Sequence, residues 1–151
     1  MVERVTYEVD GWGLGELGFD GRALAWHELP VKAGARTGFH PLVDRLQSYF
    51  AGARDSFTDV ELELAWCTPF QRRVVETMRA IPYGETATYG EIAALAGHPN
   101  AQRAVGSVCA GNRFALVVPC HRVVAADGIG SYGSLGLGYK RRLLELEGVA
   151  L

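Results

Sequence analysis

The sequence has few cysteines and no long hydrophobic run. Its 151 residues include three cysteines, Cys67, Cys109 and Cys120, an odd number that lacks the paired spacing of structural zinc or of a disulfide framework. We therefore expect a reducing, cytoplasmic setting and no metal. No apolar run approaches the roughly 18–20 residues that span a bilayer, and the first residues lack the hydrophobic stretch of a signal peptide, so we expect no membrane partner.

Neither sign of charge predominates in the whole chain. The net charge is −2, from 17 acidic and 15 basic residues, which by itself argues against a polyanionic partner. The distribution is uneven, because residues 1–66 hold eleven acids and six bases and residues 67–151 hold six acids and nine bases. Thirteen of the basic residues are arginine, which suits bidentate and stacked contacts. The second half could face phosphates, although a chance fluctuation explains the charges equally well.

The first third of the chain predicts β-strands. Apolar and polar residues alternate over residues 5–9, and Gly13–Phe19 and Ala23–Leu29 follow as further strands. Residues 30–39 are predicted to be a loop, and Pro41–Phe50 a helix with apolar residues at helical spacing. We predict an N-terminal β-sheet-plus-helix domain over residues 1–64 that carries no chemical motif and serves as scaffold.

The remainder predicts helices. Thr68 can cap a helix that begins with Pro69, and Thr88 to Glu91 fits a capping box at the start of another. A third helix is expected over Pro99–Ala110 and a last one over Lys140–Glu147. The middle pair is a helix-turn-helix candidate, or a plain packing unit. The whole is an α+β protein whose second domain, residues 65–151, is mostly helical.

One turn concentrates reactive side chains. The apolar run Phe114–Val118, predicted to be a strand, leads into a Pro-Cys-His-Arg turn at residues 119–122. A neighbouring His or Arg lowers the pKa of a thiol, and the thiolate is the nucleophile. His121 could contact Cys120 directly or through water, with Glu147 orienting it. The alternatives are a buried inert cysteine and an exposed carboxylate at a helix end.

Other chemistry finds little support. The glycines between residues 128 and 138 match neither a phosphate-binding loop nor a dinucleotide fingerprint, so we expect no cofactor. Arg103 lies among small residues at the start of a predicted helix, which would allow close approach to a DNA groove, or it is simply a solvent-exposed arginine. Tyr89 could equally be a core aromatic with a tethered hydroxyl.

A series of short sequence blocks runs through the second half of the chain: Thr68-Pro69-Phe70-Gln71, Ile81-Pro82-Tyr83-Gly84-Glu85-Thr86, Tyr89-Gly90-Glu91-Ile92-Ala93, Arg103-Ala104-Val105-Gly106, Gly111-Asn112, Pro119-Cys120-His121-Arg122-Val123 and Leu143-Leu144-Glu145-Leu146-Glu147-Gly148. In their order and spacing over about residues 68–148, these blocks resemble the O6-alkylguanine-DNA alkyltransferases. Tyr49-Phe50-Ala51-Gly52 agrees more loosely.

The resemblance implies a DNA repair protein that acts once. Cys120 would take the alkyl group irreversibly from O6-alkylguanine, with O4-methylthymine as an open second substrate. His121 would take the thiol proton, Glu147 would orient His121, and Asn112 would brace the active-site turn. Tyr89 would give a proton to the guanine ring and crowd the adjacent phosphate. The protein would be a cytoplasmic monomer that works on the nucleoid, without cofactor or metal.

The resemblance also assigns the DNA contacts. Arg103 would fill the stack that the flipped base leaves, and the helix that carries it would enter the minor groove. The same surface would include Thr88, Tyr89, Ala101, Gln102, Ala104 and Gly106.

The base pocket would be lined by Pro119, Val123, Tyr132, Ser134 and Lys140. Residues 131–136 depart from the family pattern by about one residue, which leaves open which group contacts the substrate oxygen. Two other classes remain as alternatives: a lesion-binding module without transfer, which usually lacks the acceptor cysteine, and a cysteine hydrolase, which would need an oxyanion hole.

Overall fold

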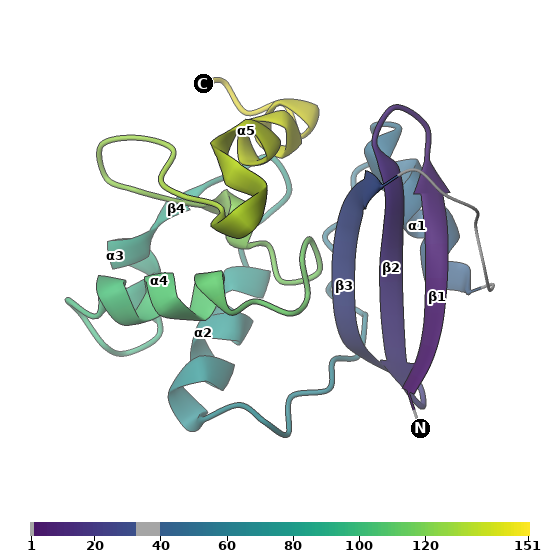
Figure 1. The fold of residues 1–151 in the computed structure, drawn as a ribbon. Helices are drawn as coiled ribbons and strands as arrows, with labels where there is room; N and C mark the ends of the chain where they lie inside the picture. Colours follow the sequence, from purple (N-terminus) through teal and green to yellow (C-terminus); the bar gives the residue numbers. More distant parts are fainter. Residues whose placement is uncertain (1, 33–39) are drawn as a thin grey trace.

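An antiparallel sheet of three strands forms the N-terminal part of the computed structural model, which describes residues 2–32 and 40–151 (Figure 1). The strands are β1 (Val2–Val9), β2 (Gly13–Asp20) and β3 (Ala23–Lys32), side by side in that order. The three predicted strands are confirmed. The predicted loop at 30–39 is wrong at residues 30–32, because β3 continues through Pro30 to Lys32, and residues 33–39 lie outside the described residues.

Helix α1 (Pro41–Phe50) covers one face of this sheet, and its predicted bounds are confirmed (Figure 1). The His40 side chain caps it by accepting a hydrogen bond from the Leu42 N–H. Its apolar side chains join the alternating strand residues in one core. Those core residues are Val5, Tyr7, Val9, Leu17, Phe19, Leu42, Val43, Leu46, Tyr49 and Phe50. We call residues 2–32 and 40–64 the sheet part.

The helical part, residues 65–151, holds four α-helices. They are α2 (Pro69–Arg79), α3 (Tyr89–Leu95), α4 (Gln102–Ala110) and α5 (Gly136–Leu146). Two short strands, β4 (Ala87–Thr88) and β5 (Val123–Val124), pair in parallel, and two 3₁₀ turns, η1 (Cys120–Arg122) and η2 (Gly133–Leu135), complete it.

Both predicted helix caps are present. Thr68 Oγ accepts from the Gln71 N–H while the Gln71 side chain accepts from the Thr68 N–H, and Thr88 and Glu91 repeat this arrangement. These reciprocal bonds satisfy N–H groups that the first turn of a helix leaves free. They fix where α2 and α3 begin, and hence the position of Tyr89 directly after the cap.

Three predicted elements are wrong in extent or type. Helix α4 begins at Gln102 and not at Pro99, because Asn100 has a φ of 71° and a left-handed residue cannot continue a helix. Helix α5 begins at Gly136, four residues before Lys140. The apolar run Phe114–Val118 is not a strand: Leu116 has a φ of 71°, and the run folds into a tight turn.

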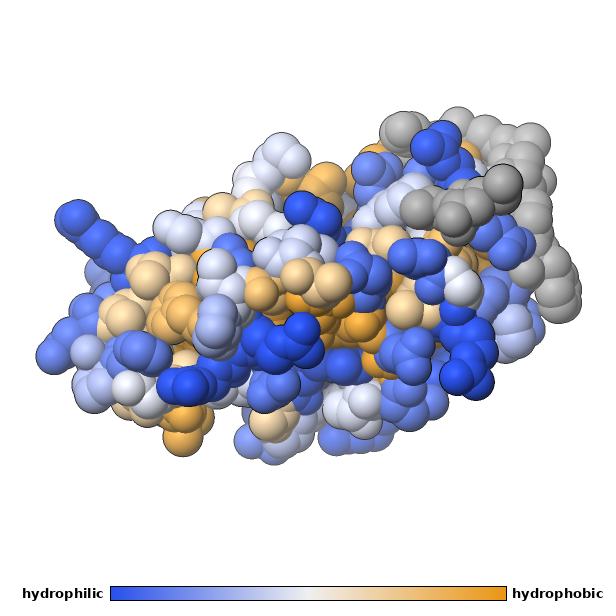
Figure 2. All heavy atoms as spheres, turned by 90° about the horizontal axis from the view of Figure 1, so that it is seen from below, coloured by the Kyte–Doolittle hydropathy of each residue, from blue (hydrophilic) through white to orange (hydrophobic). Residues whose placement is uncertain are grey.

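The two parts pack against each other beside α5, which lies above the rest of the helical part in Figure 1. The Tyr139 ring packs on Trp12 with 5.5 Å between ring centroids, and the Arg142 guanidinium lies 3.5 Å from the centroid of the same indole. From below, hydrophobic side chains reach the surface between hydrophilic ones along the middle of the molecule (Figure 2). The α+β class is confirmed, whereas the division into domains at residue 64 stays a prediction.

In the part of the chain that the structure describes, no helix has both the length and the apolar composition that crossing a membrane requires.

Candidate active site

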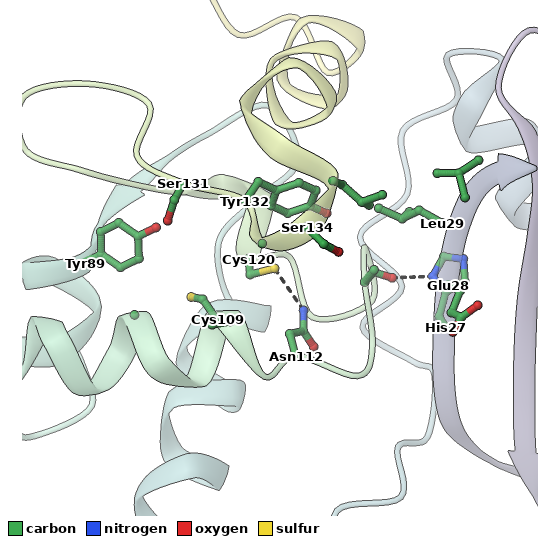
Figure 3. A pocket seen from close by; sticks show the side chains of 16 residues that line it. His27, Glu28, Leu29, Tyr89, Cys109, Asn112, Cys120, Ser131, Tyr132 and Ser134 are labelled. Atoms are coloured by element: carbon green, nitrogen blue, oxygen red, sulfur yellow. Dashed lines mark hydrogen bonds between the residues drawn. The ribbon is translucent and has the colours of Figure 1, made fainter.

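Cys120 lies at a cavity of about 340 Å³ between β3, α4 and the loop around η2 (Figure 3). The cavity is lined by His27, Glu28, Leu29, Val31, Tyr89, Gly106, Cys109, Ala110, Asn112, Ala115, Cys120, Ser131, Tyr132, Gly133, Ser134 and Leu135. Six of these were predicted as site residues: Tyr89, Gly106, Asn112, Cys120, Tyr132 and Ser134. The structure therefore brings residues from both parts of the chain around one thiol.

Asn112 holds the thiol in place. Its Nδ2 donates to Cys120 Sγ at 3.1 Å and to the Val118 carbonyl at 2.9 Å, while its Oδ1 accepts from the Phe114 N–H at 2.9 Å (Figure 3). All hydrogen-bonding groups of this amide are thus used within one turn of chain. This geometry fits the bracing role that the sequence predicted for Asn112.

The protonation state of Cys120 differs from the expectation. Burial raises the pKa of the Cys120 thiol above its ordinary value, and the opposing effects of the Asn112 hydrogen bond and the Lys140 charge are smaller. The adjacent Arg122 does not lower this pKa, because its guanidinium is turned away toward Glu147. The thiol is therefore protonated at neutral pH, and a nearby base has to take its proton before it can act as a nucleophile.

Glu147 is buried, and the alternative of an exposed helix-end carboxylate is wrong. It accepts hydrogen bonds from His121 Nε2 at 2.8 Å, from Arg122 Nε at 2.8 Å and Nη2 at 3.0 Å, and from the Gly84 N–H at 3.1 Å. The Tyr49 hydroxyl adds a further bond from α1. Burial raises the pKa of Glu147, but the bonds and charges of His121 and Arg122 lower it by more, so the carboxylate stays ionised.

This carboxylate fixes the tautomer of His121. A carboxylate only accepts, so His121 Nε2 carries the hydrogen that bonds to it. Burial lowers the pKa of His121, and Glu147 offsets this only in part, so the ring is neutral and its Nδ1 bears a lone pair. Nδ1 is buried and has no hydrogen-bond partner among the described residues. His121 thus offers an unused proton acceptor, one residue from the thiol.

Three predicted pocket residues do not line the cavity. Pro119 and Val123 are buried beside it, and neither faces it. Lys140 is also buried, and its Nζ donates to the Val123 carbonyl at 2.6 Å and to the Ser131 carbonyl at 3.1 Å. Lys140 therefore ties the end of η1 to the loop that carries Tyr132, and shapes the cavity from behind.

The predicted DNA contacts lie on α3 and α4. Gln102, Arg103 and Ala104 are exposed in the first turn of α4, while Ala101 is half-buried. Gly106 reaches the cavity. Thr88 is half-buried and its hydroxyl serves the helix cap, which leaves that oxygen engaged. Arg103 and Gly106, which lines the cavity, are thus about one turn apart on the same helix.

Comparison with known proteins decides the family. A sequence profile described as 6-O-methylguanine DNA methyltransferase, DNA binding domain, matches residues 69–149. The chain belongs to the O6-methylguanine DNA methyltransferase family. It is 52% identical over 110 residues to the methylated-DNA--protein-cysteine methyltransferase of Mycobacterium tuberculosis, covering 72% of this chain and 65% of that relative, so the match spans just under two thirds of the relative's length.

Two further relatives extend the similarity. The methylated-DNA--protein-cysteine methyltransferase of Methanopyrus kandleri is 48% identical over 120 residues, covering 79% of this chain and 87% of that protein. The crystal structure of Mycobacterium tuberculosis OGT in complex with DNA matches with a TM-score of 0.81 and 39% identity, over 96% of this chain and 92% of that chain. The fold of this methyltransferase family member is therefore shared across both of its parts.

Sequence reasoning missed several residues of the site. His27, Leu29 and Val31 line the cavity from β3, and Cys109 lines it from α4. Tyr49 reaches Glu147 from α1. Only Tyr49 carried a signal, in the loose agreement of its block with the family pattern; the β3 residues are ordinary strand residues, and only the packing of the sheet against the active-site turn shows their place.

Metal chemistry finds no donor set here. Across residues 2–32 and 40–151, no three His, Cys, Asp or Glu side chains are grouped so that they could hold a metal ion.

Proposed function

We propose that this protein transfers the alkyl group of O6-alkylguanine in duplex DNA to its own Cys120. The observation that carries the proposal is the Cys120 sulfur at the cavity, followed directly in the chain by a buried, neutral His121 that bonds to the ionised Glu147. The Mycobacterium and Methanopyrus relatives, both named methylated-DNA--protein-cysteine methyltransferases, support it. The DNA complex of the Mycobacterium structure supports DNA as the partner.

The reaction is a displacement at carbon. His121 Nδ1 takes the Cys120 proton, directly or through one water, and Glu147 stabilises the imidazolium that forms. The thiolate then attacks the methyl carbon, a C–S bond forms, and the bond from carbon to O6 breaks, leaving its electron pair on guanine. A thioether is a poor leaving group, so the protein acts once and no cofactor is required.

Charge that develops on guanine needs a donor. Tyr89 lines the cavity opposite the β3 side, and its hydroxyl is our assigned proton donor to the ring (Figure 3). The Tyr132 hydroxyl is buried and has no hydrogen-bond partner among the described residues, and Ser134 lies beside it. Either of these two could donate to the substrate oxygen. Pro119, Val123 and Lys140 support the pocket from behind.

Access to a base inside the duplex requires flipping. Extrusion costs a few kcal/mol, less for a base pair that alkylation has weakened. Arg103, exposed at the start of α4, would fill the vacated stack, and the small side chains of Ala101, Ala104 and Gly106 would let α4 approach the minor groove. Gln102 and the hydroxyl hydrogen of Thr88, whose oxygen accepts the cap bond, would contact the DNA backbone, a mode that reads little sequence.

We further infer that the protein works as a cytoplasmic monomer on the nucleoid. One chain holds the Cys120 thiol, the proton acceptor His121, the base pocket and Arg103, so the reaction needs no second subunit. Activity on O4-methylthymine belongs to the same proposal, because the same thiol would attack the same methyl carbon. Light scattering with and without DNA measures the oligomeric state.

Intact mass spectrometry tests the transfer. The protein is mixed with excess duplex oligonucleotide containing O6-methylguanine, and we expect one added methyl group per chain, located on the peptide that carries Cys120. Cys120→Ala should abolish the adduct. Cys109→Ala is the matched control, because Cys109 lines the same cavity, and it should still accept one methyl group.

Three results would contradict the proposal. They are several methyl groups per chain, a methyl group retained in Cys120→Ala, and tight binding to the lesion without any adduct. The last would favour a lesion-binding module.

A further inference from the structure

His27 joins the sheet part to the active-site turn. It lies in β3, and its backbone N–H donates to the Arg113 carbonyl at 2.7 Å, which pairs β3 with the start of the turn. Its side-chain Nδ1 bonds to the Ala115 carbonyl (Figure 3). Two successive links from one strand residue thus hold residues 113–115, five to seven positions before Cys120.

The hydrogen bonds fix the state of this histidine. The Ala115 carbonyl only accepts, so His27 Nδ1 carries the hydrogen, and Nε2 is left as the acceptor for the Tyr7 hydroxyl. Burial lowers the pKa of His27 to about 4, so the ring is neutral at neutral pH. The result is a directed chain of bonds, from Tyr7 through His27 to Ala115.

The sheet makes room for this chain. Tyr7 on β1 pairs with Gly15 on β2, and a Cβ atom at Gly15 would lie 2.5 Å from Tyr7 Cζ and 2.7 Å from its hydroxyl. Only glycine leaves the ring this position across the sheet, where its hydroxyl reaches His27. Tyr7 and His27 are both at most 4% exposed, so water does not replace either bond.

The anchored turn leads directly to the thiol. The Ala115 carbonyl also accepts from the Val117 N–H, and the Phe114 carbonyl accepts from the Val118 N–H. The Val118 carbonyl accepts a hydrogen bond from Asn112 Nδ2, and the same nitrogen donates to Cys120 Sγ. Leu116, between them, has the left-handed φ of 71°, which costs free energy for a branched residue and persists only where its surroundings enforce it.

We propose that Tyr7 and His27 are positioning residues for the acceptor thiol: the Tyr7–His27–Ala115 hydrogen-bond chain holds the 112–118 turn so that Asn112 presents Cys120 to the cavity. The inference rests on the proposed function, because the role of Tyr7 and His27 is defined by the alkyl transfer. The hydrogen bonds themselves do not depend on that function. Neither residue touches the substrate, so their effect is transmitted through the turn.

Substitution of His27 tests the proposal. His27→Leu keeps much of the volume and removes both side-chain hydrogen bonds, and we expect the rate of methyl transfer to fall about tenfold because the turn loses this anchor. The fall should be equal for duplex DNA and for the free O6-methylguanine base, with unchanged affinity for unmodified duplex. Tyr7→Phe removes only the hydroxyl, and should reduce the rate by about threefold.

A conservative variant separates positioning from general destabilisation. Asn places its amide N–H near the position of His Nδ1, so His27→Asn should restore the bond to Ala115 and recover most of the rate. Rates are measured well below the melting temperature of each variant. A His27→Leu protein that transfers methyl at the wild-type rate would overturn the proposal, and so would a His27→Asn protein as slow as His27→Leu although both are folded.

A second readout does not depend on methylated guanine. The rate of Cys120 alkylation by iodoacetamide, followed on its peptide by mass spectrometry over a range of pH, reports the position and pKa of the thiol. We expect His27→Leu to change this pH profile, while the profile of Cys67, in the same sample, stays the same. If the wild-type protein transferred no methyl group, the proposed function would fail, and this profile would still decide the role of His27. An unchanged Cys120 profile would overturn it.

Discussion

The two parts of the molecule each place one buried histidine beside the active-site turn, and the two histidines are held in different ways. His121, in the helical part, bonds to an ionised carboxylate that Arg122 also binds. His27, in the sheet part, bonds only to neutral groups, a carbonyl and a tyrosine hydroxyl. Both have a pKa below the ordinary value because burial disfavours the charged ring.

The difference shows what each part does. The Glu147 carboxylate can stabilise a proton on His121, so that histidine is able to exchange a proton during a reaction. Among the described residues, no charged group stabilises a proton on His27, so that histidine keeps one tautomer, in agreement with the proposed role as a rigid connector. In the proposed reaction, the helical part supplies the chemistry, and the sheet part supplies the frame that holds the turn in place.

We expect the largest loss of stability from substitution of Glu147, the carboxylate to which residues of both parts donate hydrogen bonds. Glu147→Gln removes the charge and leaves the Arg122 guanidinium, 1% exposed, without a counter-ion. Removing one partner of a buried ion pair costs about 3–5 kcal/mol, so we expect the free energy of unfolding in urea to fall by that amount. Glu145→Gln, two residues earlier and exposed, is the control and should change it by less than about 0.5 kcal/mol.

Equal effects of Glu147→Gln and Glu145→Gln on the free energy of unfolding would contradict this prediction. They would mean that Glu147 is not the point at which Tyr49 of the sheet part and His121 and Arg122 of the helical part meet.

Lowering the pH should reduce the free energy of unfolding through His27. His27 has a pKa of about 4 in the folded chain and an ordinary value of 6.5, so folding favours its neutral form. Its stabilising contribution is complete above pH 6.5 and is lost as the pH falls toward 4, where only the unfolded chain binds the proton. The loss amounts to at most about 3 kcal/mol. Urea unfolding of wild type across this range measures it.

His27→Leu serves as the control in this experiment. It should flatten the decline between pH 6.5 and 4, and leave the contributions of His40 and His121, whose pKa values are also lowered by burial. An equally steep decline in His27→Leu would show that His27 is not the group that titrates.

Tyr49→Phe should have a smaller effect, because it removes one of several hydrogen bonds to Glu147 and no charge. The free energy of unfolding should fall by about 1.5–3 kcal/mol, the usual contribution of one hydrogen bond to a charged group. Tyr139→Phe is the matched control, since the Tyr139 hydroxyl also crosses between the parts but bonds to the Pro30 carbonyl. Only Tyr49→Phe should also shift the titration of His121, followed by NMR.

The sequence predicted the helical part well because its signals are local. Threonine caps, the proline at the start of α2 and the Pro-Cys-His-Arg turn are each contained within a few residues. The start of α4 was wrong by three residues, because the left-handed conformation of Asn100 depends on the turn around it. The turn at 114–118 was wrong in type, since an apolar run indicates burial and does not distinguish a strand from a buried turn.

The contribution of the sheet part to the site could not be predicted from local patterns. Tyr7 and His27 are 20 residues apart, and His27 and Ala115 are 88 apart. Such pairs meet only after the sheet has formed and packed on the helices. The exposed Arg103 and the thiol are both in the more basic half of the chain, residues 67–151, and the meaning of the charge division stays a prediction.

The smallest expected effect on stability belongs to Arg103→Ala. Arg103 is exposed at the start of α4, so the free energy of unfolding should change by less than about 0.5 kcal/mol. Methyl transfer from duplex DNA should nevertheless slow by about tenfold, because nothing then fills the stack behind the flipped base. Transfer from the free base should be kept, in contrast to His27→Leu, which should slow both. Gln102→Ala, on the same exposed turn, controls for general loss of DNA contact. Equal losses on duplex and free base would remove Arg103 from the DNA interface and assign it, with His27, to the frame of the thiol.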